Sequence, residues 1–252
     1  MMGRSGFPRI LSSMKRIHLI SNPRNLSTAL MYSFAQRSDT QVVDEPFYGY
    51  YITQRPDIDH PGTEEVLASM ETDSQIILDD VIFREYEKPV LFVKNMAHHF
   101  VDLNQQFITE LNNLILIRNP KQLISSIAQK IQEPTMEDIG SQKQYELYDY
   151  LLANRNRPVV LDSGELLKNP LQVLRKVCEA LDIPFEKSML SWKAGPRPED
   201  GAWAKYWYHS VHQSTGFSKQ SSSNRPLPDH LKELYQTAQP YYTALYENSI
   251  KA

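Results

Sequence analysis

The stretch that decides the fold is IHLISNPRNLSTAL, residues Ile17 to Leu30. It runs from an apolar segment typical of a buried strand, through a polar loop, into a stretch with helical character. A strand that feeds the N-terminus of a helix presents unpaired backbone N–H groups and about +0.5 of an elementary charge, which favour anions. The loop contains no glycine and no Gly-Lys-Ser/Thr sequence, which a nucleotide-triphosphate loop would have. We therefore expect an anion site of a different kind.

Two interpretations of this loop stay open from its own residues. Ser27 and Thr28 supply hydroxyl donors, and the guanidinium fork of Arg24 suits phosphate or sulfonate oxygens. The alternative is structural: Asn25 or Ser27 caps the following helix, and Arg24 is solvated.

Outward from this stretch, strands alternate with helices. Short apolar runs predict buried parallel strands at Ile17–Ile20, Val90–Val93, Leu114–Ile117 and Val159–Leu161. Gln41–Val43, just before Glu45, is a further strand-like segment. Helices are predicted after Asn119-Pro120 (with Leu123, Ile127 and Ile131 on one face), after Asn169-Pro170, over Gln142–Asn154 and over Asp229–Tyr246, with a kink at Pro240. The prediction is a single α/β domain, a central parallel sheet flanked by helices, with ligands at the carboxyl ends of the strands.

A second stretch, NLILIRNPKQLISSIAQ (residues 113–129), repeats the strand–loop–helix arrangement. Arg118 falls at the carboxyl end of the strand, and Ser126 lies about 12 Å or less from the start of the next helix at a rise of ~1.5 Å per residue. The two side chains could bind one tetrahedral anion between them. Two neighbouring anion sites suggest a nucleoside that carries phosphates at two positions.

The two motifs together resemble those of the sulfotransferases that use 3′-phosphoadenosine 5′-phosphosulfate (PAPS). Segments from VVDEPFYGYY to DGAWAKYWYHSVHQSTGF are similar to a bacterial, fungal and plant branch of this family. The resemblance implies a P-loop type of nucleotide-binding fold. It also implies that Arg24, Asn25, Ser27 and Thr28 bind the 5′-phosphosulfate, and that Arg118 and Ser126 bind the 3′-phosphate.

The catalytic base does not carry over directly from the cytosolic relatives, which have Lys-Thr-His where this chain has Lys94-Asn95-Met96. Glu45 resembles the glutamate of several carbohydrate sulfotransferases and is our first candidate; His98 is the second. Each also has a structural interpretation: Glu45 as a surface carboxylate or salt-bridge partner, and His98 with His99 as a pair that starts a helix. Arg24 and Lys94 are the candidates for stabilising charge on the departing phosphate oxygen.

Another departure concerns Leu26, which stands where many relatives have glycine. Glycine tolerates the left-handed backbone that tight phosphate loops need, so Leu26 either changes the turn or carries some strain.

Aromatic side chains gather in GAWAKYWYHSVHQSTGF, residues 201–217. Such a run suits the wall of a pocket for a small acceptor, and we take Trp203, Trp207 and His209 as candidate acceptor-binding residues. Docking of these aromatics on the core is the alternative.

Composition bounds the remaining questions. The chain has 252 residues, a net charge of −3, one cysteine and no apolar run of membrane-spanning length. We expect residues 1–14 to form a flexible extension, residues 15–252 one domain, and the serine-rich stretch 219–226 a surface loop. No nucleic-acid partner, membrane association or metal is expected; the location expected is cytoplasmic. Dimers are common among similar proteins, which makes a homodimer one expectation.

The sequence therefore predicts a PAPS-dependent sulfotransferase that acts on a hydroxyl or amine of a small-molecule acceptor. A P-loop kinase or NTPase is one alternative; a non-catalytic nucleotide-binding protein of the same fold is the other. The sequence identifies neither the acceptor nor the base, and it does not establish that the chain is catalytically active.

Overall fold

A computed structural model describes residues 14–58, 60–218 and 225–252 of the chain. Apart from Met14, the predicted N-terminal extension lies outside these residues, and so do residues 219–224 of the predicted serine-rich loop. Met14 is buried, in contact with the core.

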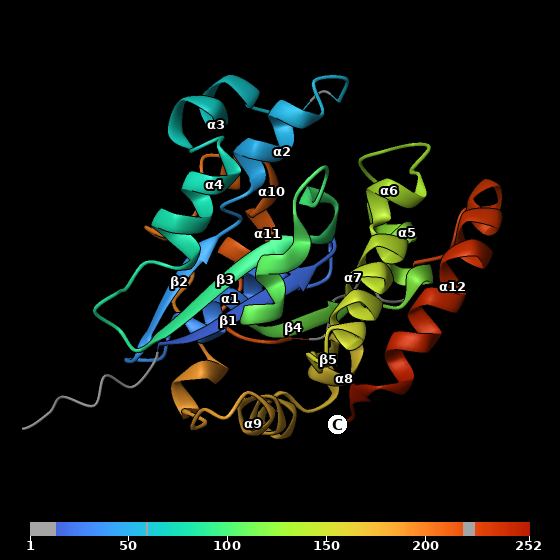
Figure 1. The fold of residues 1–252 in the computed structure, drawn as a ribbon. Coiled ribbons are helices and arrows are strands. Elements are labelled where there is room, and N and C mark those ends of the chain that lie inside the picture. The colour runs from blue at the N-terminus through green and yellow to red at the C-terminus, as the bar shows by residue number, and fades with distance from the viewer. Residues whose placement is uncertain (1–13, 59, 219–224) are drawn as a thin grey trace, which may run out of the picture.

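A six-stranded sheet in the order β2-β3-β1-β4-β5-β6 forms the centre of the structure (Figure 1). All five pairings between these strands are parallel. The strands are β1 (Lys15–Ser21), β2 (Thr40–Asp44), β3 (Val90–Met96), β4 (Asn112–Ile117), β5 (Val159–Asp162) and β6 (Ser249–Ile250). The five predicted strands are confirmed. The sixth has two residues, too few for any apolar pattern to show.

Helices cover both faces of the sheet (Figure 1). The α-helices are α1 (Ser27–Phe34), α2 (Tyr48–Gln54), α3 (Thr63–Ser69), α4 (Ser74–Ile77), α5 (Pro120–Ile127), α6 (Met136–Ile139), α7 (Ser141–Ala153), α8 (Ser163–Lys168), α9 (Pro170–Ala180), α10 (Ala204–Trp207), α11 (His209–His212) and α12 (Lys232–Glu247). Shorter helical turns are η1 (Leu78–Ile82), η2 (Ala97–His99), η3 (Gln105–Glu110), η4 (Lys187–Leu190) and η6 (Asp229–Leu231).

Successive side chains of a strand pack into two separate hydrophobic cores, one on each face of the sheet. Ile17 and Leu19 of β1 point to one face, where they pack with α1 and α9, whereas Ile20 packs on the other face with α7 and α12. This alternation is what a period of two residues produces when both faces of a sheet are covered.

Asparagine caps fix the helices that follow β4 and β5. The Asn119 carboxamide accepts a hydrogen bond from the backbone N–H of Lys121, and Asn169 accepts one from Gln172, each with proline at the first helical position. Both predicted caps are confirmed. The predicted stripe on the first of these helices runs too far, because α5 ends at Ile127 and Ile131 lies beyond it with 39% of its surface exposed.

Pro240 lies inside α12, as predicted for this C-terminal helix. Within the described part of the chain, no helix has the length and apolar character needed to cross a membrane.

Candidate active site

The candidate residues lie at the edge of the sheet where the parallel strands end. β1 leads into the loop that holds Arg24, β2 leads to Glu45, and β4 leads to Arg118. Lys94 lies near the end of β3, between the first two in the sheet order. The fold thus brings together side chains that are up to 94 positions apart in the chain.

The loop before α1 has a strained backbone. Arg24 and Leu26 both have left-handed conformations, with φ of 63° and 73°. A left-handed conformation costs a non-glycine residue roughly 1–2 kcal/mol, and such costs concentrate at functional sites. Leu26 therefore adopts the left-handed backbone that glycine tolerates better, and it carries the strain.

No side chain of residues 14–58, 60–218 and 225–252 caps the N-terminus of α1. Leu26 occupies the cap position and makes no capping hydrogen bond, so the structural interpretation in which Ser27 or Asn25 caps the helix is wrong. The first backbone N–H groups of the helix stay without an intrahelical partner, as the physics of helix ends requires. This end of α1 has the features of an anion site.

Asn25 instead ties the loop to the sheet. Its side chain is buried, accepts a hydrogen bond from Ser21 Oγ at 2.6 Å and donates one to the carbonyl oxygen of Leu116 at 2.7 Å. Ser27 is buried beside it and Thr28 is half-buried. The hydrogen bonds of Asn25 therefore account for its presence by structure alone.

The two predicted anion motifs meet directly. Arg24 Nε donates to Ser126 Oγ at 3.2 Å, and the Arg118 guanidinium donates to the carbonyl oxygen of Arg24. No ion pair joins these arginines to a carboxylate anywhere in residues 14–58, 60–218 and 225–252. Because the two guanidinium groups have no carboxylate to balance their charge, a bound anion would stabilise them.

A third arginine, absent from the sequence prediction, contributes to this field. Burial, then the charges of Arg24 and Arg225, lower the pKa of Arg118 to about 10, with Asp162 opposing them. Desolvation and then Arg225 lower the pKa of Arg24 as well, although Arg24 as a residue is exposed. No motif marked Arg225, since it lies in a serine-rich stretch 107 positions after Arg118 and 201 positions after Arg24.

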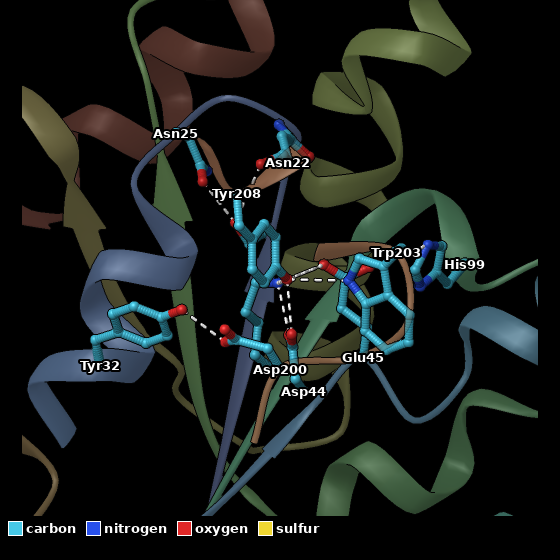
Figure 2. A network of polar contacts seen from close by, with 11 residues as sticks. Asn22, Asn25, Tyr32, Asp44, Glu45, His99, Asp200, Trp203 and Tyr208 are labelled. Carbon is cyan, nitrogen blue, oxygen red and sulfur yellow. Dashed lines mark hydrogen bonds and ion pairs between the residues drawn. The ribbon is translucent and has the colours of Figure 1, made fainter. Parts of the chain in front are cut away.

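Lys94 and the carboxylates of Asp44 and Glu45 form a buried cluster at the same edge of the sheet. Figure 2 shows the two carboxylates. Lys94 Nζ donates to Asp44 Oδ1 at 2.8 Å and to Glu45 Oε1, and the three side chains are 0%, 1% and 7% exposed. Glu45 is therefore a salt-bridge partner but not a surface carboxylate. Its φ of 44° is left-handed, which turns the chain at the end of β2.

The cluster perturbs the ionisation of each of its members. Burial raises the pKa of Asp44 and of Glu45, and the charge of Lys94 only partly opposes this. Burial alone lowers the pKa of Lys94, but the charges of the two carboxylates outweigh it and the net direction is upward. A carboxylate with a raised pKa is suited to proton transfer near neutral pH.

Tyr208 is the residue of the cluster that the sequence prediction missed. Its hydroxyl accepts from Lys94 Nζ at 2.8 Å and from Trp203 Nε1 at 3.1 Å, and donates to Asp44 Oδ2 at 2.7 Å. Figure 2 shows Trp203 and Glu45 on the same side of the Tyr208 ring. The aromatic run in the sequence indicated this segment, but nothing in it distinguished Tyr208 from its neighbours.

The three predicted acceptor-binding residues lie at different depths. Trp203 is buried and Trp207 is half-buried against the same aromatic cluster, whereas His209 is exposed and its Nε2 contacts the Gln213 side chain at 3.1 Å. Trp203 thus connects to the buried cluster through Tyr208, and His209 lies at the surface.

Of the two histidines after β3, His99 lies nearer to Glu45. His99 Nε2 is 3.8 Å from Glu45 Oε2, and its ring stacks on Tyr48 and Tyr51 with centroids 5.2 Å and 4.9 Å away. Burial lowers the pKa of His98 to about 4 and that of His99 well below its ordinary value. Both rings are therefore neutral at physiological pH.

A second contact fixes the segment that carries Tyr208 to α1. Asp200 Oδ1 accepts a hydrogen bond from the Tyr32 hydroxyl at 2.6 Å (Figure 2). Its other oxygen lies 2.9 Å from His212 Nε2. The helix behind the anion loop and the aromatic segment are thereby joined. No group of three or more potential metal ligands occurs among the residues that the structure describes.

The fold defines an α/β protein of the P-loop-like class, with Arg24, Arg118 and a buried Lys94–carboxylate cluster at the carboxyl edge of its sheet. A family described as "Sulfotransferase domain" matches residues 14–249. The chain belongs to this family.

Two solved structures are similar to the chain over nearly their whole length. The sulfotransferase domain of the Synechococcus PCC 7002 olefin synthase has 14% identity and a TM-score of 0.57, covering 92% of this chain and 95% of that one. A sulfotransferase from Alicyclobacillus acidocaldarius has 14% identity and a TM-score of 0.53, covering 92% and 96%. These likenesses establish the sulfotransferase fold.

Two curated relatives from Arabidopsis thaliana are more similar in sequence. Branched-chain-amino-acid aminotransferase-like protein 1 is 40% identical over 230 residues, 91% of this chain and 41% of that protein. Protein 2 is 37% identical over 233 residues, 92% and 41%. The chain thus spans about two-fifths of the length of the curated relatives it matches.

Proposed function

We propose that the chain transfers the sulfuryl group of PAPS to a hydroxyl or amine of a small-molecule acceptor by in-line displacement. The observation that carries this proposal is that Arg24 and Arg118, which pair with no carboxylate of the described residues, lie at the same carboxyl edge of the sheet as the buried Glu45–Lys94 pair. Sulfuryl transfer from PAPS needs a site for a multiply charged donor and a group that accepts the acceptor's proton. This edge of the sheet offers candidates for each.

The nucleotide donor fits the anion site by charge. Arg118 and Ser126 would hold the 3′-phosphate, and Arg24 with the uncapped N-terminus of α1 would hold the 5′-phosphosulfate. A phosphate oxygen at Ser126 would accept a hydrogen bond from the Ser126 hydroxyl, whose oxygen accepts from Arg24 Nε in this structure. Arg225 adds positive charge to the same field.

Glu45 would act as the base. PAPS supplies the sulfuryl group; as the acceptor oxygen bonds to sulfur, its proton passes to the Glu45 carboxylate, a step of the kind that contributes roughly 10²–10⁴-fold. Lys94 and Arg24 stabilise the charge that develops on the departing phosphate oxygen. The neutral His98 is the alternative base.

The other two function classes make different demands on the chain. A P-loop kinase or NTPase needs a lysine before Ser27-Thr28, and this chain has Leu26 there. A non-catalytic nucleotide-binding protein needs the arginines but not a carboxylate buried against Lys94. The names of the curated relatives describe proteins more than twice as long, so we do not transfer an aminotransferase activity. The homodimer and the cytoplasmic location stay predictions from the sequence.

Thermal denaturation with two nucleotides tests the proposal. Adenosine 3′,5′-bisphosphate at a hundredfold excess over Kd should stabilise the fold by ~2.7 kcal/mol. This raises the Tm by roughly 5–11 °C at the ~2–4 °C per kcal/mol typical of domains this size. ATP with Mg²⁺ should shift the Tm much less. A larger shift with ATP would contradict the proposal in favour of a kinase or NTPase.

Two arginine variants locate the effect. Arg118→Ala should remove most of the shift, because it deletes a guanidinium that can bind a phosphate through two hydrogen bonds. Arg157 is exposed and lies just before β5, at the opposite edge of the sheet. Arg157→Ala should therefore keep the full Tm shift with adenosine 3′,5′-bisphosphate. Loss of the shift in both variants would show that the nucleotide binds by non-specific charge attraction.

A further inference from the structure

The ammonium of Lys94 uses all three of its N–H bonds inside the protein. They go to Asp44 Oδ1 at 2.8 Å, to Glu45 Oε1 and to the Tyr208 hydroxyl at 2.8 Å. The Lys94 side chain is 0% exposed, so no water replaces these partners. Two of the three partners, Asp44 and Tyr208, have no role in the chemistry proposed above.

The geometry decides where the Tyr208 proton points. The hydroxyl oxygen lies 2.7 Å from Asp44 Oδ2 and 3.4 Å from Glu45 Oε1, so it donates its single proton chiefly to Asp44 and makes a second, longer hydrogen bond to Glu45. Trp203 Nε1 donates to the same oxygen at 3.1 Å and fixes its position. Asp44 is thereby held by Lys94 on one oxygen and by Tyr208 on the other.

A charge count gives Asp44 a function. With both carboxylates ionised, Asp44 and Glu45 carry two negative charges against the one positive charge of Lys94. When Glu45 takes up a proton, the Asp44 charge is left to balance Lys94. A lysine buried with Glu45 alone would lose its counter-charge at that moment, and burial would then favour its neutral form.

We propose that Asp44 and Tyr208 are positioning residues, which hold Lys94 charged and in place while Glu45 gains and loses a proton. Their part in turnover rests on the proposed function, because the proton comes from the acceptor. As the acceptor oxygen–sulfur bond forms, the bond between sulfur and the nucleotide phosphate breaks and its electron pair goes to the phosphate. The acceptor proton moves to Glu45, and the cluster changes from one net negative charge to none.

Several elements contribute groups that act on Glu45. These are Asp44 of β2, Lys94 of β3, Tyr48 of α2, His99 of η2 and Tyr208 between α10 and α11. Burial raises the pKa of Glu45; the Asp44 charge raises it further, whereas the Lys94 charge and the Tyr208 hydrogen bond lower it. Asp44 and Tyr208 therefore act on Glu45 with opposite signs, and replacing each should shift its titration in opposite directions.

The test follows the Glu45 carboxyl directly, by NMR of isotope-labelled glutamate side chains in the full chain over a pH titration. Glu45→Gln identifies the resonance by its disappearance. In Asp44→Asn the Glu45 midpoint should move to lower pH, and in Tyr208→Phe it should move to higher pH. Neither donor nor acceptor is needed, so the result is independent of whether the chain transfers sulfate.

Matched variants separate positioning from general disturbance. Asp80→Asn and Tyr206→Phe change exposed side chains and should leave the Glu45 midpoint where it is in the unmodified chain. Asp44→Glu keeps the charge and should restore the midpoint more closely than Asp44→Asn. If Asp44→Asn does not fold, the upward shift in Tyr208→Phe alone still tests the proposal.

Two results would overturn the assignment. One is a Glu45 midpoint that moves in the same direction in Asp44→Asn and Tyr208→Phe, and the other is a midpoint that neither variant moves. Once an acceptor is found, the acidic limb of the pH profile of kcat/KM should move to lower pH in Asp44→Asn and to higher pH in Tyr208→Phe, as the Glu45 midpoint does. A uniform loss of rate with an unchanged profile would mean that both residues are merely structural.

Discussion

Replacing Lys94 by methionine tests how strongly this buried cluster depends on its one positive charge. The Lys94 side chain is 0% exposed and the carboxylates of Asp44 and Glu45 are 1% and 7% exposed. Methionine has similar length but cannot donate. Lys94→Met therefore leaves two buried carboxylates without their cation, a change that costs about 3–5 kcal/mol when they stay ionised. For a domain of this size the Tm should fall by roughly 6–20 °C.

The loss of stability in Lys94→Met should depend on pH. Burial already raises the pKa of both carboxyl groups, and removing Lys94 removes a charge that lowers them. A carboxyl group whose pKa is higher in the folded than in the unfolded chain contributes to the stability of the fold. This contribution is complete at pH values below the pKa that the group has in the unfolded chain. That contribution is lost as the pH rises through the folded value. Lys94→Met should therefore be most destabilised at about pH 8 and less so at about pH 5.

Chemical denaturation of both proteins at the two pH values gives the free energies of unfolding. Lys205→Met is the matched control, because Lys205 pairs with Glu65 at the surface, where the two side chains are 53% and 55% exposed. Such a pair contributes about 0–1 kcal/mol, and the control should show only that loss at either pH. The double variant Lys94→Met/Glu45→Gln should be more stable than Lys94→Met, since one uncompensated charge is gone.

A loss of stability in Lys94→Met that is equal at the two pH values would refute this reasoning. It would mean that lost packing, rather than unpaired carboxylates, accounts for the destabilisation. A double variant less stable than Lys94→Met would lead to the same conclusion.

Three further predictions concern the base, the loop and the aromatic segment. Glu45→Gln should reduce sulfuryl transfer by roughly 10²–10⁴-fold while the Tm shift with adenosine 3′,5′-bisphosphate persists; full activity would make His98 the leading candidate. Leu26→Gly should be more stable than Leu26→Ala by about 1 kcal/mol in denaturant, because alanine keeps the penalty of the left-handed backbone. The opposite order would show that this loop carries no strain. Trp203→Ala should cost about 3–5 kcal/mol of stability, whereas His209→Ala should change it by less than about 0.5 kcal/mol, and equal losses would contradict their different burial.

The repeating elements of the sheet could be predicted because their signals are local. Parallel strands buried on both faces require apolar runs, and β1, β3 and β4 each show one. Asn119 and Asn169 mark helix starts because a cap bonds within three residues of itself. The end of α5 was harder to predict, since Ile131 continues the apolar spacing although the helix has already ended.

The candidate site was predictable only in part, because local sequence signals give the ends of strands but not the contacts between distant segments. Arg24 and Arg118 follow strands directly, so strand order alone brings them to one edge. Whether Asn25 caps a helix or ties the loop to β4 depends on the position of Leu116, which no local pattern gives. The preference for His98 over His99 likewise could not account for the ring of Tyr48, against which His99 stacks.

The amino-acid sequence by itself determined the parallel α/β sheet and the two anion motifs at its carboxyl edge, because apolar periodicity and the ends of strands are properties of neighbouring residues. Only the tertiary structure decided that Tyr208 joins Asp44, 164 positions away, around Lys94, and that the charge of Arg225 acts on Arg24 and Arg118. Such contacts form when distant segments dock on a finished sheet. The free energy of docking comes from burial and charge in three dimensions, which spacing along the chain does not encode.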